Sequence, residues 1–201
     1  MYDQLRFDYL SCAEHKTLHT PNFDRVANRG VKFTNAYVQS PVCGASRMST
    51  YTGRYVSSHG AGWNKFPIRV GEFTLGDHLR RQGMSCWLLG KTHMQADEEG
   101  LARLGIPADS TIGLRQAECG FDPWVRDDGL HGNGWDGDYG ENDGPYNRYL
   151  KEKGYDTDNP GATYANGSVE NGRLASGWYI ENADKPANIR EEDSETPWLT
   201  R

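Results

Sequence analysis

The chain has 201 residues and a formal net charge of −6, and 36% of its residues are hydrophobic. This size supports one domain with a sizeable core. The acidic balance without a basic cluster excludes nonspecific nucleic-acid binding, and no apolar stretch reaches the roughly 20 residues of a membrane span. No signal peptide precedes residue 3, and the four widely spaced cysteines suit a reducing compartment. The sequence therefore predicts a cytoplasmic protein that binds neither nucleic acid nor membrane. The cysteines are Cys12, Cys43, Cys86 and Cys119.

The first half of the chain predicts alternating helices and strands. Residues 22–30 have helical apolar spacing, with Asn22 as the candidate N-cap and Gly30 as the C-terminal cap, and a strand is expected to follow. A second helix of about three turns fits between the break at residues 40–41 and the cap at Gly53. A third helix over 73–83 leads into a mostly apolar strand over 84–90. Such alternation is typical of an α/β fold.

The second half is poorer in regular patterns. Residues from about 120 to 147 are rich in glycine and acidic side chains, which predicts a long loop, and interspersed aromatic residues make it a candidate substrate-facing lid. Residues 149–193 are polar and interrupted by Gly and Asn. Residues 195–201 are typical of the start of another capped helix.

The most informative pattern is the helix start at Cys43. Unpaired backbone N–H groups and the helix dipole favour negative charge at this end of a helix. Arg47 lies four residues on and returns to the same face, where its guanidinium can bind two oxygens of a sulfate or phosphate. The spacing therefore predicts a nucleophile and an anion-binding cation on one helical turn.

Cys43-Gly-Ala-Ser-Arg47, followed by Thr52-Gly53-Arg54, resembles the motif C-x-P-S-R-x-x-x-x-T-G-R. This motif belongs to the type I sulfatases and the related phosphonate monoester hydrolases of the alkaline phosphatase superfamily. The resemblance implies an α/β sandwich with a mixed central sheet flanked by helices on both faces. It also implies that residues 1–201 are the N-terminal part of one catalytic domain, incomplete at its C-terminus.

The same resemblance implies that Cys43 is converted to formylglycine, whose hydrated aldehyde is a metal-activated nucleophile. Position 45 is Ala where the family motif has Pro. Aerobic formylglycine-generating enzymes usually recognise C-x-P-x-R, whereas the radical maturases also use C-x-A-x-R. The expected modifying partner is one of these two enzymes.

The N-terminus, Met1-Tyr2-Asp3-Gln4-Leu5, resembles the family's first strand and metal-binding turn. The resemblance implies that Asp3 and the modified Cys43 bind a divalent metal, for which Ca²⁺ or Mn²⁺ suits oxygen ligands. Sulfatases commonly have two adjacent aspartates here, so Gln4 favours the phosphonate monoester hydrolases. The remaining ligands and the leaving-group acid are expected beyond residue 201.

Gly90-Lys91-Thr92-His93 resembles the family motif G-K-x-H and follows a predicted strand, so its side chains are expected at the carboxyl edge of the sheet. The resemblance implies that Lys91 neutralises a substrate or nucleophile oxygen, and that His93 hydrogen-bonds the nucleophile or relays a proton. Asn64 falls where the phosphonate monoester hydrolases have an asparagine that contacts the ester. Asp77 and His78 lie inside a predicted helix, so we do not expect them to bind the metal.

These residues predict a hydrolase of sulfate or of phosphonate and phosphate esters, with a small anionic ester as substrate. Arg47, Lys91 and Asn64 would bind the ester, and a homo-oligomer is expected for the full-length protein. The alternative is a non-catalytic anion-binding or truncated sulfatase-like protein, which Ala45 favours. A cysteine-dependent phosphatase does not fit, because its motif C-x-x-x-x-x-R separates the two residues by five positions rather than three.

Overall fold

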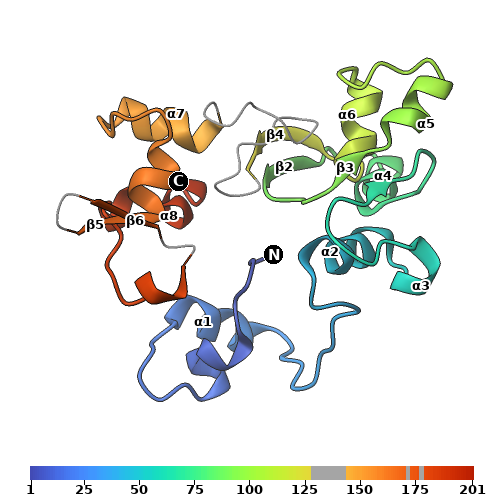
Figure 1. Ribbon diagram of the computed structural model, residues 1–201. Coiled ribbons are helices and arrows are strands. Elements are labelled where there is room, and N and C mark those ends of the chain that lie inside the picture. The colour runs from blue at the N-terminus through green and yellow to red at the C-terminus, as the bar shows by residue number, and fades with distance from the viewer. Residues whose placement is uncertain (128–143, 171–172, 177–178) are drawn as a thin grey trace.

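The computed structural model describes residues 1–127, 144–170, 173–176 and 179–201 (Figure 1). The α-helices are α1 (Pro21–Arg29), α2 (Cys43–Thr52), α3 (Val56–His59), α4 (Leu75–Arg81), α5 (Glu98–Arg103), α6 (Thr111–Ala117), α7 (Pro145–Glu152) and α8 (Glu195–Leu199). The strands are β1 (Pro67–Ile68), β2 (Trp87–Gly90), β3 (Gln95–Ala96), β4 (Asp122–Arg126), β5 (Gly167–Glu170) and β6 (Arg173–Ser176). Short 3-10 turns occupy Phe7–Tyr9, Ser11–Ala13, Ile180–Asn182 and Glu191–Asp193, and a π-turn occupies Gly161–Ala165.

The strands pair in three separate two-stranded sheets within the described residues. β1 pairs with β3 and β2 with β4, both in parallel, whereas β5 and β6 are antiparallel. In the β2·β4 pair, Trp87 lies opposite Asp122 and Gly90 opposite Arg126. Because the strands are parallel, their carboxyl ends meet at one edge. The segment after Gly90 and the last residue of β4 are therefore neighbours.

A small hydrophobic core lies under α2. Its buried members are Met48, Ala61, Ile68, Met94 and Cys119, against which two partly buried aromatic residues pack. These residues come from α2, from the loop before β1, from β1, from the turn after β2 and from the turn between α6 and β4. The core therefore fixes the helix that begins at Cys43 against the turn that contains Lys91.

Close backbone contact joins α4 to the turn between α6 and β4. The N–H group of Gly76 donates to the Cys119 carbonyl at 3.0 Å. A Cβ atom at Gly76 would lie 2.4 Å from the Gly120 carbonyl carbon, and Gly120 itself has φ +80°. Only glycine, which has no Cβ atom, permits this approach, so a larger residue at either position would disrupt the contact.

The C-terminal elements are joined through Asp193, which is 1% exposed. Its carboxylate accepts hydrogen bonds from the hydroxyl groups of Tyr149 at 2.7 Å and Tyr155 at 2.9 Å, and from Arg190 Nε at 2.9 Å. Since α7 carries Tyr149 and α8 begins two residues after Asp193, this carboxylate fixes the start of α8.

Several elements agree with the sequence-based expectations. Helix α2 begins at Cys43 and ends at Thr52, and Gly53, with a φ of 68°, is its left-handed C-cap. The helix expected over 73–83 is present as α4, which is shorter and begins with a capping box of Thr74 and Asp77. The expected apolar strand is present as β2, although it is shorter than predicted. The α/β fold class is confirmed.

Other local expectations were wrong. Thr20 is the N-cap residue of α1, so Asn22 lies inside the helix. The residues after Gly30 form no strand, and Val31 and Phe33 are 80% and 78% exposed. Residues 1–5 likewise form no strand. Neither of these two segments pairs with a strand in the described residues, and β-structure depends on such pairing more than on local propensity.

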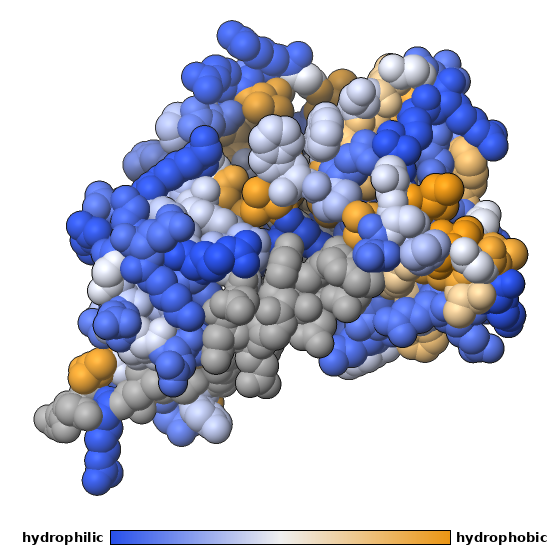
Figure 2. Space-filling model, turned by 90° about the horizontal axis from the view of Figure 1, so that it is seen from above, coloured by the Kyte–Doolittle hydropathy of each residue, from blue (hydrophilic) through white to orange (hydrophobic). Residues whose placement is uncertain are grey.

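The region expected to be a loop from about 120 to 147 includes β4 at its start and the first residues of α7 at its end. The candidate lid over 128–143 lies outside the described residues. Figure 2 shows that the face seen from above is mostly hydrophilic and that its hydrophobic groups form separate patches. No helix among the described residues is long and apolar enough to cross a membrane.

Candidate active site

Cys43 is the first residue of α2, and a distant loop completes the cap of this helix. The N-cap residue Val42 offers no side-chain hydrogen bond. Instead, Asn64 Oδ1 accepts the N–H group of Gly44 at 2.8 Å. Because only the amide oxygen can accept this bond, the NH₂ group of Asn64 is directed elsewhere and remains a donor. The structure thus places Asn64 beside Cys43, as an organiser of the helix start.

Arg47 connects α2 to two other segments. Its Nη1 donates to the Lys91 carbonyl at 2.6 Å, and its Nη2 lies 3.2 Å from Asp3 Oδ1. The residue is only 4% exposed. A buried guanidinium must have its N–H groups satisfied, and these two partners do so in part. Arg47 therefore holds Asp3 and the backbone at residue 91 next to the nucleophile helix.

Lys91 completes a triad of charged groups. Its Nζ donates to Asp3 Oδ2 at 3.0 Å, so that the two carboxylate oxygens face two different cations. Partial burial acts to raise the pKa of Asp3. The hydrogen bonds and charges of Lys91 and Arg47 outweigh that effect and lower the pKa below its usual value. Asp3 is therefore ionised at neutral pH.

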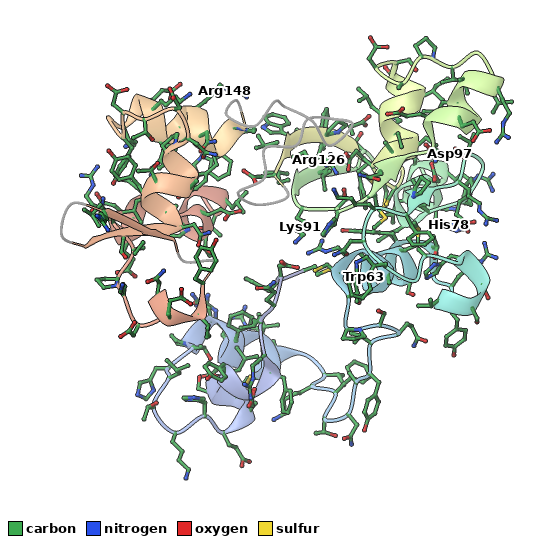
Figure 3. The ribbon with its side chains drawn as sticks, viewed as in Figure 1. Trp63, His78, Lys91, Asp97, Arg126 and Arg148 are labelled. Atoms are coloured by element: carbon green, nitrogen blue, oxygen red, sulfur yellow. The ribbon has the colours of Figure 1, made fainter. Side chains whose placement is uncertain are left out.

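Strand β2 ends at Gly90, and the turn after it carries Lys91 into this site, with His93 two residues further along the chain. Figure 3 shows Lys91 and Arg126 near the ends of β2 and β4, with His78 and Asp97 further out toward α4 and α5. His93 is partly exposed and has φ 59°, a left-handed conformation that is uncommon for a residue other than glycine. Such a conformation persists where the surrounding structure fixes it, and it occurs often at functional sites.

The structure brings Asp3, Arg47 and Lys91 into direct contact. It also brings the side chain of Asn64 into contact with the backbone of the residue that follows Cys43. Cys43 is a free, partly exposed cysteine. Arg47, the cation that we expect to bind the ester, is buried. Lys91, with 18% of its side chain exposed, is the more accessible of the two cations.

Glu195, at the start of α8, is a neighbour that the sequence did not indicate. Partial burial raises the pKa of Glu195, the positive charge of Lys91 opposes this, and the negative charge of Asp3 adds to it. The same helix also reaches β2, because a Cβ atom at Gly90 would lie 3.9 Å from Leu199 Cδ2. No local pattern could have shown this proximity, because some 100 residues separate Lys91 from Glu195.

Two titratable groups near the site have structural roles. Asp77 Oδ2 accepts the Thr74 N–H at 3.0 Å and its hydroxyl at 2.6 Å, so this carboxylate serves the capping box. His59 Nε2 lies 2.8 Å from Ser49 Oγ, which resembles a nucleophile and base pair. However, His59 Nδ1 accepts the Ala61 N–H at 3.1 Å, so Nε2 carries the proton of the neutral ring and cannot accept one from Ser49.

The residues present fit one part of a metal site. Asp3 offers a carboxylate, which is the type of ligand that a hard divalent cation prefers. Both of its oxygens already face cations, and the described residues contain no group of three or more His, Cys, Asp or Glu side chains that could hold a metal ion. The expected pair of Asp3 and Cys43 is therefore an incomplete ligand set.

Comparison with known proteins identifies relatives of this chain. The sequence profile of the family described as Sulfatase matches residues 1–158. An ulvan-active sulfatase from Formosa agariphila is 28% identical over 148 residues, which cover 67% of this chain and 30% of the relative. The human steryl-sulfatase is 39% identical over 105 residues, which cover 47% of this chain and 18% of the relative.

A similar solved structure is the phosphonate monoester hydrolase SpPMH from Silicibacter pomeroyi. It matches with a TM-score of 0.71 and 26% identity, over 98% of this chain and 35% of that chain. This chain therefore spans about a third or less of the length of these proteins.

Proposed function

Because the chain belongs to the sulfatase family, we propose that it forms the nucleophile-bearing part of a hydrolase of sulfate or of phosphonate and phosphate esters. The observation that carries the proposal is the contact of Asp3 with both Arg47 and Lys91, next to the helix that starts with Cys43. Two cations and the start of a helix favour an anion at this place. The small anionic ester is the proposed substrate.

Two groups that the family implies would complete the chemistry. Conversion of Cys43 to formylglycine would supply a hydrated aldehyde as nucleophile, and a divalent cation such as Ca²⁺ or Mn²⁺, held in part by Asp3, would supply Lewis-acid activation. A formylglycine-generating enzyme or a radical maturase is the proposed modifying partner. Ala45 lies in the first helical turn, where Ala and Pro are both compatible with the helix.

The chain's own side chains then have separate roles. Lys91 binds a non-bridging oxygen of the ester and stabilises the charge that develops on it. Arg47 orients Asp3 and the backbone of residue 91, and its buried guanidinium adds positive charge behind the ester-binding position. The free NH₂ group of Asn64 donates to the ester beside Cys43. His93 exchanges a proton with the group at position 43. Sulfate and phosphonate esters offer similar oxygens, so these contacts serve either substrate.

The test is turnover by the protein co-expressed with a maturase. p-Nitrophenyl sulfate and p-nitrophenyl phenylphosphonate are the paired substrates, and mass spectrometry measures the fraction of position 43 that is converted. We expect hydrolysis of at least one ester, and its loss in Cys43→Ala. Cys12→Ala is the matched control, because Cys12 is also a free and partly exposed cysteine.

The relative rates on the two esters would identify the preferred substrate class. Turnover that persists in Cys43→Ala would exclude the proposed nucleophile. If converted protein hydrolyses neither ester, the chain by itself is a non-catalytic member of the family.

A further inference from the structure

The turn that follows β2 alternates between partly exposed and buried residues. Lys91 and His93 are partly exposed, whereas Thr92 and Met94 are 0% and 1% exposed. The two residues that the proposed function uses are therefore held by neighbours that point into the protein. The contacts of these neighbours determine where Lys91 and His93 lie.

Thr92 is bound to a fully buried carboxylate. Its Oγ1 donates to Glu118 Oε2 at 2.6 Å, and Glu118 is 0% exposed. Glu118 follows the last residue of α6, whose N-cap Ser110 accepts the Gly113 N–H. The C-terminal end of α6 thus presents an acceptor directly to the middle of the Lys91–His93 segment.

A buried arginine holds the same turn on the other side of His93. Arg126 Nε lies 2.9 Å from Glu118 Oε1, and both side chains are at most 2% exposed. Arg126 Nη2 donates to the Met94 carbonyl at 2.8 Å. Since Arg126 ends β4 opposite Gly90, the ion pair lies at the carboxyl edge of the β2·β4 sheet.

Burying this ion pair costs free energy, because both charges lose their hydration. A protein with two hydrophobic side chains of similar volume in place of a buried ion pair is often as stable. The pair therefore has little value as a source of stability alone. Its contacts go to residues 92 and 94, on both sides of His93, whose left-handed backbone must be held by its surroundings.

We propose that Glu118, oriented by Arg126, is a positioning residue that fixes Thr92 and thereby places Lys91 and His93 for ester hydrolysis. The effect on catalysis rests on the proposed function. The effect on the turn does not, and it can be measured on the 201-residue chain without any activity.

The sharpest test compares Thr92→Val with Thr92→Ser. Valine keeps the shape and removes the hydroxyl, whereas serine keeps the hydroxyl and removes a methyl group. Amide hydrogen exchange of residues 91–95 is measured, with residues 22–29 of α1 as an internal reference. We expect exchange to rise at least about tenfold in Thr92→Val, because Glu118 loses its donor, and to stay close to wild type in Thr92→Ser.

The opposite order, with serine loosening the turn and valine preserving it, would show that Thr92 only fills space, and would overturn the proposal. If Thr92→Val does not fold, Glu118→Gln replaces it. The amide oxygen still accepts from Thr92 but the charge opposite Arg126 is lost, so exchange of residues 91–95 should still rise. Unchanged exchange would again overturn the proposal.

Kinetics test the catalytic part. In converted, active protein we expect Thr92→Val to lower kcat by about tenfold or more with a smaller change in KM, and Thr92→Ser to restore most of the rate. Wild-type kcat in a Thr92→Val protein with a loosened turn would refute positioning for catalysis. Inactivity of the wild type would instead contradict the proposed function, while the exchange result would still decide whether Glu118 fixes the turn.

Discussion

Asp3 and Lys91 lie 88 residues apart in the sequence, yet Asp3 Oδ2 and Lys91 Nζ are 3.0 Å apart. The other oxygen of the same carboxylate faces Arg47. One side chain near the N-terminus therefore pairs with two cations, one from α2 and one from the turn after β2, and leaves the cluster with a net positive charge. This relationship makes the site dependent on three separate segments.

Replacing Asp3 with Asn should destabilise the protein. Arg47, with 5% of its side chain exposed, would then face Lys91 without a neutralising charge. We expect a loss of about 1–2 kcal/mol in the free energy of unfolding at pH 7, less than for a fully buried pair because 38% of the Asp3 side chain is exposed. Urea denaturation measures this loss.

The effect of Asp3→Asn should also depend on pH. The folded-state pKa of Asp3 is lowered, so the stability it contributes is present above the unfolded carboxyl pKa of about 4 and is lost as the pH falls through the folded value. The two proteins should converge in strongly acidic solution. Asp8→Asn is the control, because Asp8 also pairs with an arginine, Arg6, but both of these side chains are exposed to solvent. An equal loss in both variants would argue against a special role for Asp3.

Asn64→Ala should weaken the start of α2. The substitution removes the acceptor of the Gly44 N–H group, and loss of such a cap costs about 1 kcal/mol. Thermal unfolding should show the lower stability. Asn64→Asp retains the acceptor and is the matched variant. A stability of Asn64→Ala equal to that of Asn64→Asp would show that the cap contributes nothing.

Gly44→Ala should be destabilising even though alanine favours helices. A Cβ atom at position 44 would lie 3.0 Å from Asn64 Oδ1 and 3.1 Å from Asn64 Cα, so the loop would have to move. We expect a loss of about 1–3 kcal/mol, which is typical of overpacking. Gly62→Ala is the control, because no atom lies within 4 Å of a Cβ there. Chemical denaturation of the two variants would show whether this close approach matters.

The four cysteines should differ in reactivity. Cys12 and Cys43 are partly exposed, whereas Cys86 and Cys119 are buried. Burial, together with the charges of Glu118 and Asp77, raises the pKa of Cys119 well above its usual value, which disfavours the reactive thiolate. A thiol reagent applied to native, unconverted protein should label positions 12 and 43 first, as peptide mass spectrometry would show. Early labelling of Cys119 would contradict its buried position.

Glu195→Gln should change how stability depends on pH. The folded-state pKa of Glu195 is raised by partial burial, so the stability that its neutral form provides is present below the unfolded value of about 4.3 and is lost as the pH rises through the folded value. Glutamine does not titrate. The variant should therefore gain stability relative to wild type as the pH rises above the unfolded value of about 4.3, which urea denaturation at a series of pH values would measure. A relative loss of stability of Glu195→Gln as the pH rises would mean that attraction to Lys91 outweighs the burial of the carboxylate.

Local signals in the sequence predicted the helices best. The start of α2 at Cys43 and its C-terminal cap at Gly53 each depend on residues within a few positions of one another. The same signals failed for the strand expected after Gly30. A strand depends on a partner elsewhere in the chain, and such a partner is not encoded locally.

The sequence by itself determined that Cys43 and Arg47 share the first turn of a helix, and that Lys91 and His93 follow a strand. Only the tertiary structure decided that Arg47 is buried against Asp3, and that Glu118 holds the turn at Thr92. The physical reason is the range of the interactions. Helix caps and spacing act between near neighbours, whereas the charge triad and the buried ion pair arise when packing brings distant segments together and removes water from between them.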